Sequence, residues 1–145
     1  MRRVEYLTDK REFLGMPAEM LMEKDVITCV PSDSARHVAS QLTKFNIGSL
    51  PVVDEDGRLL GLVTEFDLLQ ALVDGRDLGA VRAEEVMTRT VRAVPETAAA
   101  HAIIELLNAE HLIRIPVTRD GKLVGVVARR DILFGYIKAT AKYWP

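Results

Sequence analysis

The sequence predicts an α+β fold made of two copies of one supersecondary unit, each with the order β-α-β-β-α. The first observation is an internal repeat, because residues 18–69 align with residues 83–133 with only one-residue gaps at turns. The second is an Asp-Gly pair between two apolar runs in each copy, at Asp56 and Asp120, which is a strong hairpin signal. The third is the recurrence of apolar residues at the spacing typical of amphipathic helices.

Each copy is predicted to open with a short strand that ends at a proline and leads into a helix. The strands cover residues 27–30 and 91–94, with Pro31 aligned to Pro95, and proline suits a strand end. Asp33 or Ser34 in the first copy and Thr97 in the second are residue types that cap helix N-termini. The apolar residues behind these caps are Val38, Leu42 and Phe45 in the first copy, and Ile103, Leu106 and Leu107 in the second.

A hairpin and a second helix complete each copy. The stretches "LPVVDEDGRLLGLV" and "IPVTRDGKLVGVV" form the hairpins, and each runs into a polar corner that begins a helix. One copy has too little apolar surface to enclose a core, so we expect the two to pack on each other. The predicted divisions are an N-terminal arm (1–17), the first repeat (18–74), a linker (75–82), the second repeat (83–137) and a tail (138–145).

The composition is that of an ordinary globular protein. Of its 145 residues, 48% are hydrophobic and 28% charged, and the formal net charge of −2 gives no basic field that would favour nucleic acid or a membrane. Cys29 is the single cysteine, so no internal disulfide can form. The start of the chain lacks the apolar segment of a signal peptide, and no apolar run is long enough to span a bilayer. We therefore expect a cytoplasmic protein.

The corner before the second helix reads "TEFD" in the first copy and "ARRD" in the second. Thr64 and Asp67 have the spacing of a capping box, in which each side chain accepts a hydrogen bond from the other residue's backbone N–H. The second copy keeps the acid as Asp131 but has Ala128 in place of the hydroxyl, and alanine is a poor N-cap. An acid that persists without its hydroxyl hints at a further role, although the capping interpretation stays open.

The same corner has the chemistry of a nucleotide site. A helix N-terminus presents free N–H groups and a positive dipole end, which suit a phosphate. A carboxylate in the first turn can accept hydrogen bonds from both hydroxyls of a ribose, and a hydroxyl can donate to a phosphate oxygen. Groups that recognise ribose and phosphate would thus lie on one turn.

The duplicated pattern resembles the CBS domain, named for cystathionine β-synthase, which occurs in tandem pairs called Bateman modules. The residues that carry the resemblance are Pro-Val-Val-Asp-x-x-Gly-x-Leu-x-Gly-Leu-Val-Thr-x-x-Asp in the first copy and a close variant in the second, over about residues 18–137. The resemblance implies repeats packed sheet to sheet with pseudo-two-fold symmetry. It also implies a non-enzymatic module that binds AMP, ADP or ATP in the clefts between the repeats and modulates a partner protein.

The resemblance assigns residues to one complete site and one weaker site. It places ribose on Asp67 and phosphate near Thr64, with Arg114 and Arg130 reaching across to the phosphates, where arginine binds bidentately. Aliphatic residues would line the adenine pocket, although each of them could instead belong to the hydrophobic core. The arginines could instead lie on a solvated surface. The first site comprises Ile27, Thr28, Ile47, Gly48, Thr64, Asp67, Arg114 and Arg130, and the second comprises Val91, Arg92, Leu112, Ile113, Ala128 and Asp131.

No catalytic residue, metal site or required cofactor is predicted. His37 and His101 occupy equivalent positions, but neither has further ligands at metal-binding spacing. No base is arranged to activate Cys29 as a nucleophile.

The resemblance implies a homodimer formed through the helices and an effector protein of unknown identity. The alternatives are a ligand-independent dimerisation scaffold, a binder of S-adenosylmethionine or NAD, and a nucleic-acid binder through Arg114, Arg129 and Arg130, against which the net acidity argues. Tyr143 and Trp144 near the C-terminus pack either on the fold or on a partner.

Overall fold

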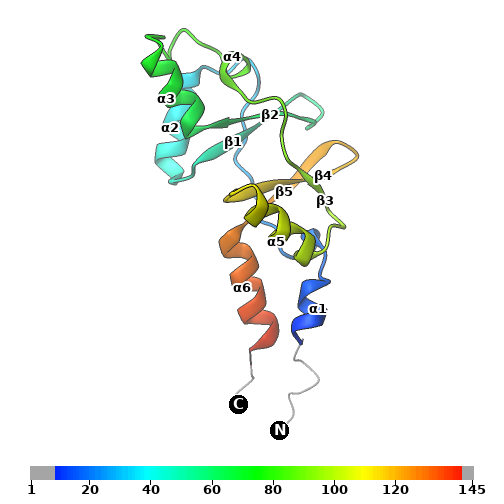
Figure 1. Ribbon diagram of the computed structural model, residues 1–145. Helices are drawn as coiled ribbons and strands as arrows, with labels where there is room; N and C mark the ends of the chain where they lie inside the picture. Colours follow the sequence, from blue (N-terminus) through cyan, green and yellow to red (C-terminus); the bar gives the residue numbers. More distant parts are fainter. Residues whose placement is uncertain (1–8, 142–145) are drawn as a thin grey trace. The chain divides into compact units, whose positions relative to one another are not determined.

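The computed structural model describes residues 9–141, which form two compact units built from interleaved parts of the sequence (Figure 1). Of the described residues, unit 1 takes 9–26, 93–119 and 124–141, and unit 2 takes 27–92 and 120–123. The opening of each sequence copy therefore belongs to the same unit as the body of the other copy. The sequence repeats and the compact units thus divide the chain differently.

Unit 2 contains a two-stranded antiparallel sheet and three helices. Ser49 at the start of the first strand lies opposite Thr64 at the end of the second, so the strands form the predicted hairpin. Val38 and Leu42 are buried one helical turn apart, as their spacing predicts. In chain order the elements are α2 (Ala35–Phe45), β1 (Ser49–Val53), β2 (Leu59–Thr64), α3 (Glu65–Val73) and α4 (Ala83–Val86). The core consists of Cys29, Ala35, Val38, Leu42, Leu50, Val52, Val63, Leu68, Val81 and Ala83.

Unit 1 contains a three-stranded sheet with helices before and after its strands. The strand order is β3-β4-β5, with β3 parallel to β4. Its elements are α1 (Lys10–Leu14), the 3-10 helix η2 (Ala18–Met20), β3 (Val94–Pro95), α5 (Ala100–Ala109), β4 (Arg114–Arg119), β5 (Lys122–Ala128) and α6 (Arg129–Thr140). The core consists of Phe13, Ala18, Leu21, Val94, Ala100, Ile103, Leu107, Ile115, Val117, Val127 and Ile132.

The opening strands are shorter than the sequence predicts. Of residues 27–30, Cys29 alone forms a ladder bridge, which is parallel to Val52. In the other copy the strand is Val94–Pro95, where residues 91–94 were expected, and Val94 pairs with Val117. In the first copy Pro31 has no N–H to extend the ladder beyond Cys29, whereas in the second Pro95 lies within the strand and the Glu96 N–H still donates to the Thr118 carbonyl at 3.1 Å.

The helices after these strands begin in different ways. The Ser34 hydroxyl caps α2 by accepting a hydrogen bond from the His37 N–H at 3.0 Å, as predicted. The predicted cap Thr97 is wrong, because α5 begins behind Ala99 and Thr97 lies in the preceding turn. The Ala100 N–H donates to the Met16 carbonyl at 2.8 Å, as the Ala35 N–H donates to the Val81 carbonyl at 2.7 Å in the other unit, so α5 differs from α2 in lacking a side-chain cap.

Hydrogen bonds from the opening segments also fix the structural correspondence between the units. The Glu84 N–H donates to the Pro31 carbonyl at 3.1 Å, and the Glu19 N–H donates to the Glu96 carbonyl at 3.0 Å. Since Glu84 and Glu19 are equivalent in the repeat, Pro31 corresponds to Glu96 and not to Pro95. Pro31 and Pro95 align in the sequence repeat, but their positions in the two units differ by one residue.

The two ends of the described chain both belong to unit 1. Within the predicted N-terminal arm, Phe13 of α1 is only 2% exposed and makes an edge-to-face contact with Tyr136 of α6, with ring centroids 5.3 Å apart. The predicted tail begins inside α6, while Tyr143 and Trp144 lie outside the described residues. Over residues 9–141 no helix is both long enough and apolar enough to cross a bilayer.

Candidate functional site

The corner between β2 and α3 in unit 2 is a complete capping box. Thr64 Oγ1 accepts a hydrogen bond from the Asp67 N–H at 3.1 Å, and Asp67 Oδ2 accepts one from the Thr64 N–H at 2.9 Å. The hydroxyl of Thr88 lies 3.5 Å from both carboxylate oxygens, which is too long for a strong hydrogen bond. The cap therefore fixes the carboxylate through Oδ2 and leaves Oδ1 with acceptor capacity.

The equivalent corner between β5 and α6 in unit 1 keeps half of this box. The Ala128 N–H donates to Asp131 Oδ2 at 2.7 Å, whereas the methyl group of Ala128 offers no acceptor in return. The acid that persists without its hydroxyl therefore still caps the helix. Its retention needs no ligand to explain it, and any ligand would have to use Oδ1, which accepts no hydrogen bond from the residues that the structure describes.

Six of the eight residues predicted for the first site lie in unit 2. Gly48 is brought next to the corner, because the Glu65 N–H donates to its carbonyl at 3.0 Å. A Cβ at Gly48 would lie 3.2 Å from Glu65 Oε1, so a larger residue would require the Glu65 side chain to shift slightly. Ile27 and Ile47 are partly buried against the core of unit 2, which supports core packing as one of their roles, and Thr28 is exposed.

The other two residues predicted for the first site, Arg114 and Arg130, lie in unit 1. Arg114 starts β4 and is half-buried, and this burial lowers the pKa of its guanidinium. The neighbouring carboxylate of Asp131 acts in the opposite direction, while the charge of Arg130 lowers the pKa further. The corner at Asp131 therefore has cations from its own unit, which the sequence argument did not anticipate.

The residues predicted for the second site are divided between the units. Leu112, Ile113, Ala128 and Asp131 lie in unit 1, whereas Val91 and Arg92 lie in unit 2. Arg129, a member of the basic group considered for nucleic acid, donates from Nε to the Leu112 carbonyl at 2.9 Å. This arginine is therefore used to hold the start of α6 against the start of β4.

Sequence reasoning missed one residue beside each carboxylate. Thr88 forms an antiparallel bridge with Leu62 next to Asp67, and Glu23 forms the same bridge with Val126 next to Asp131. In the sequence, a glycine in each hairpin marks the place where the opening segment crosses the strand. A Cβ at Gly61 would lie 2.9 Å from the Thr88 carbonyl, so glycine is required where the opening segment crosses the strand. Glu23 adds a carboxylate to the second corner, in which Arg114 and Arg130 supply positive charge.

A shallow hollow adjoins each corner. Asp67 lines one of about 190 Å³ together with Phe66, Gln70, Ala71, Asp74, Arg76, Glu85 and Val86. Asp131 lines one of about 250 Å³ together with Met20, Leu21, Met22, Glu23, Phe134, Gly135 and Lys138. The Arg76 guanidinium in the first hollow is paired with Glu85 at 3.1 Å.

Histidine and cysteine provide no further site in the structure. Within residues 9–141 no group of three His, Cys, Asp or Glu side chains is placed to hold a metal ion. His37 and His101 are exposed on α2 and α5. Cys29 is buried, and its burial, with a smaller contribution from the charge of Asp33, raises the pKa of the thiol to about 12. The thiol is therefore protonated and a poor nucleophile at neutral pH.

Comparison with known proteins defines the class. A family model described as "CBS domain" matches residues 18–74 and 83–138, and the chain therefore belongs to the CBS-domain family. The resemblance inferred from the repeated motif is confirmed, as is a mixed helix-and-sheet fold with two such repeats.

The relatives include a protein of which the match covers about three quarters and a much longer enzyme. The uncharacterized protein YlbB of Bacillus subtilis (strain 168) is 34% identical over 113 residues, which are 77% of this chain and 76% of YlbB. The inosine-5′-monophosphate dehydrogenase of Methanocaldococcus jannaschii is 32% identical over 117 residues, which are 80% of this chain but 23% of the dehydrogenase. The crystal structure of the CBS domain pair of protein MJ0100, in complex with 5′-methylthioadenosine and S-adenosyl-L-methionine, is 32% identical with a TM-score of 0.72, covering 83% of this chain and 96% of that one.

Proposed function

We propose that this CBS pair is a regulatory module that binds an adenosine-containing ligand at the corner formed by Thr64 and Asp67, with AMP, ADP or ATP as the ligand. The observation that carries the proposal is that the cap uses one oxygen of the Asp67 carboxylate and leaves the other. Oδ2 accepts the Thr64 N–H at 2.9 Å, which holds the carboxylate in place, while Oδ1 retains acceptor capacity for a ribose hydroxyl. The cap and the ligand role are therefore compatible and do not compete.

The same corner supplies groups for a phosphate. The Thr64 oxygen accepts from the Asp67 N–H, which leaves the hydroxyl proton to be donated to a phosphate oxygen. The N-terminus of α3 adds a positive dipole end. We assign Arg114 and Arg130 to the phosphates, Ile27, Thr28 and Ile47 to the adenine, and Gly48 to the space beside the corner. These assignments rest on the family pattern.

A second, weaker site is proposed at the corner of Asp131. Ala128 provides no hydroxyl there, and Glu23 takes the place that Thr88 has in the other unit, so a phosphate would meet an additional negative charge. Val91, Arg92, Leu112 and Ile113 complete this proposed site.

S-adenosylmethionine is the second candidate ligand. The solved CBS pair of MJ0100 is 32% identical to this chain and was crystallised with S-adenosyl-L-methionine and 5′-methylthioadenosine. Both compounds carry an adenosyl group and no phosphate, so they would use the ribose acceptor and the adenine pocket without a phosphate contact to the arginines. The two candidate ligands therefore differ in whether they offer a phosphate to Arg114.

The proposed output is a change in the association of the protein with itself and with an effector. Exposed apolar side chains form a stripe on α3 at Phe66, Leu69 and Val73, and Leu133 and Ile137 form a similar stripe on α6. We propose that these stripes are buried in a homodimer and that ligand binding biases its packing. A regulatory role without catalysis and a cytoplasmic location belong to the same proposal, and the effector has no identity yet.

Calorimetric titration of the full chain with adenosine, AMP, ATP and S-adenosylmethionine tests the proposal. Asp67→Asn is the informative variant, because the asparagine oxygen can still cap Thr64 while its NH₂ group replaces the acceptor. We expect it to abolish adenosine binding with little change in melting temperature, and Asp131→Asn, the matched control, to have a smaller effect. Arg114→Ala should weaken ATP binding and spare adenosine. If no adenosine compound binds at millimolar concentration, the proposal is wrong and the scaffold interpretation replaces it.

A further inference from the structure

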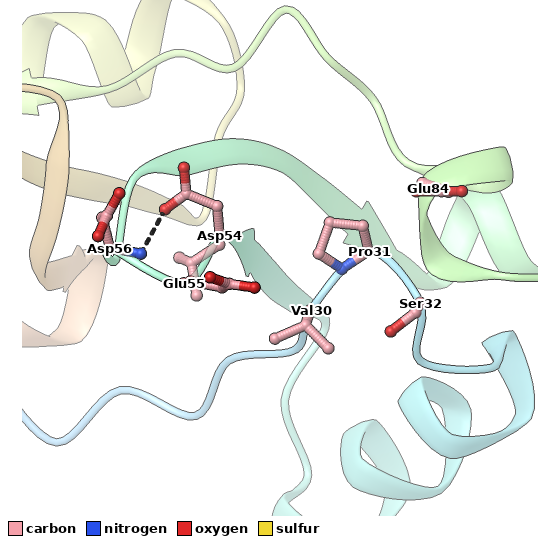
Figure 2. Close-up of a pocket in the computed structure, with 8 residues that line it drawn as sticks. Val30, Pro31, Ser32, Asp54, Glu55, Asp56 and Glu84 are labelled. Carbon is pink, nitrogen blue, oxygen red and sulfur yellow. Dashed lines mark hydrogen bonds between the residues drawn. The ribbon is translucent and has the colours of Figure 1, made fainter.

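A separate hollow of about 480 Å³ lies in unit 2 at the end of β1 opposite the Asp67 corner (Figure 2). It is bounded by residues 30–32 after the opening strand, by residues 53–56 at the turn between β1 and β2, and by Glu84 of α4. Its volume is in the range of small-ligand pockets. The proposed nucleotide site does not use any of these residues.

The lining combines an apolar part with carboxylates. Val30, Pro31 and Val53 form the apolar part, and the acids are Asp54, Glu55, Asp56 and Glu84. No lysine, arginine or histidine is among the lining residues. Figure 2 shows the acidic side chains of the turn together on one side of the hollow and Glu84 on α4 on the other.

The acids have few partners of their own. Asp54 Oδ1 accepts the N–H groups of Asp56 and Arg58, both at 2.9 Å, so Oδ2 is left for another donor. Glu84 has a loose ion pair at 3.8 Å with Arg82, whose side chain is largely exposed to solvent. The hollow therefore holds negative charge that the protein neutralises only weakly.

The equivalent place in unit 1 identifies what neutralises such a site. The hydrogen bonds of the opening segments match Glu84 with Glu19 and Pro31 with Glu96. Asp54 matches Arg119, because each lies two residues after a bridged valine, Val52 in unit 2 and Val117 in unit 1. In unit 1 the Arg119 guanidinium binds the Glu96 carboxylate through two nitrogens, with Nη2 to Oε1 at 2.8 Å and Nε to Oε2.

Unit 1 thus fills this position with its own guanidinium, whereas unit 2 has an acid where the arginine would be and a hollow in front of it. The side chain of Glu19 also reaches the Glu96 carboxyl, so the counterpart of Glu84 takes part in the occupied version of the site. The same backbone arrangement therefore accommodates a guanidinium in one unit and offers carboxylates without one in the other.

We infer that the hollow of unit 2 binds a guanidinium group supplied from outside the chain, namely the arginine side chain of a partner segment. The carboxylates of Asp54 and Glu84 would accept its N–H donors, as Glu96 does for Arg119. Val30, Pro31 and Val53 would pack against the methylene groups of the arginine. Arginine fits better than lysine, because its planar fork matches carboxylates and because it is the group found in unit 1.

Nuclear magnetic resonance titration of the ¹⁵N-labelled full chain tests this inference. The probes are the peptide acetyl-Gly-Arg-Gly-amide, the same peptide with citrulline in place of arginine, and free argininamide. We expect the arginine peptide to shift the amide signals of residues 30–32, 53–56 and 84, and the neutral citrulline peptide to leave them unchanged. Added NaCl should weaken the effect, because the attraction is electrostatic.

Two variants sharpen the test. Glu84→Gln should weaken binding of the arginine peptide by about threefold to tenfold, while the matched change Glu19→Gln in unit 1 should have no effect. Asp54→Arg should abolish binding by placing an internal guanidinium where unit 1 has one.

Three results would overturn the inference. They are shifts of equal size with the citrulline peptide, unchanged affinity in both Glu84→Gln and Asp54→Arg, or saturation by argininamide with no binding of the peptide. The last result would assign the hollow to a free small molecule and not to a partner segment.

Discussion

Asp67 accepts the Thr64 N–H while Thr64 accepts the Asp67 N–H, at 2.9 Å and 3.1 Å, and the other unit has only the first of these bonds. The pair thus provides a natural comparison between a complete and an incomplete cap in one chain. The two caps differ by the hydroxyl of Thr64, which Ala128 lacks, so the contribution of this hydroxyl to stability can be measured directly.

Restoring the missing hydroxyl should stabilise unit 1. Ala128→Thr provides an acceptor for the Asp131 N–H, and we expect it to raise the free energy of unfolding by about 1 kcal/mol. The reverse change, Thr64→Ala, should lower it by a similar amount. Urea unfolding followed by circular dichroism measures both. Ala128→Val controls for side-chain size without an acceptor, and equal stabilisation by Val and Thr would show that the hydroxyl is not responsible.

The N-terminal arm should be required for the stability of unit 1. Phe13 is 2% exposed and packs against Tyr136, so Phe13→Ala should lower the free energy of unfolding by about 3–5 kcal/mol. Phe45 of α2 is 44% exposed, and Phe45→Ala is the matched control, with a much smaller expected loss. Comparable losses in the two variants would contradict the placement of Phe13 in a core.

Cys29 should be unreactive in the folded protein. Its thiol is buried, and this burial raises the pKa to about 12. Because the folded pKa lies above that of the unfolded chain, the associated stability is fully present at neutral pH and is lost as the pH rises through about 12. We expect a disulfide reagent at pH 8 to label Cys29 only after urea unfolds the protein. Rapid labelling in buffer would exclude a buried thiol.

The pair of Glu96 and Arg119 should contribute to acid stability. The hydrogen bond from Arg119 is the main cause that lowers the pKa of Glu96 in the folded protein. A lowered folded pKa gives stability that is present above the unfolded pKa and is lost as the pH falls through the folded value. Arg119→Gln should therefore move acid unfolding, followed by circular dichroism, to higher pH.

Arg76→Gln is the control for this acid-stability prediction. The main cause that lowers the pKa of Glu85 is the backbone N–H of Arg82, and the contribution of Arg76 is smaller. Removing Arg76 should therefore shift acid unfolding less than removing Arg119 does. A shift of the same size in both variants would show that net charge, and not the specific pair, sets the acid limit.

The exposed helix stripes should control self-association. Leu69→Lys on α3 removes an exposed apolar contact and adds a charge without disturbing the buried Leu68 and Ala71. If the stripes form the proposed dimer, light scattering after gel filtration should report the monomer mass for Leu69→Lys and the dimer mass for the parent protein. Gln70→Lys, beside the stripe, is the control and should remain dimeric. A monomeric parent protein would remove the basis for this proposal.

Much of the fold could be predicted from the sequence, because the determining signals are local. The Asp-Gly turns, the spacing of Val38 and Leu42 and the cap at Ser34 each depend on a few neighbouring residues, and all are confirmed. Thr97 was a wrong cap because α5 begins two residues later than expected, behind Ala99, whose side chain has no acceptor. The correspondence of Pro31 with Glu96 was missed because it is set by hydrogen bonds from the opening segments, which are distant in sequence.

The candidate site was predictable to a similar extent. The pattern of Thr64 and Asp67 predicted a capping box, and the structure confirms it. Thr88 was missed because it reaches Asp67 through a bridge between distant segments, and only the glycine at 61 marked the crossing. The roles of Arg114 and Arg130 at the first site remain predictions.

The interleaving of the two units also constrains how the protein is made. On the ribosome, residues 9–26 emerge before residues 93–119 and 124–141, which are their partners in unit 1. Most of unit 2 is contiguous and can collapse while translation continues. The segment 9–26, with Phe13 and Leu21 still unburied, must therefore wait until residues 93–141 have emerged before it can be buried in unit 1.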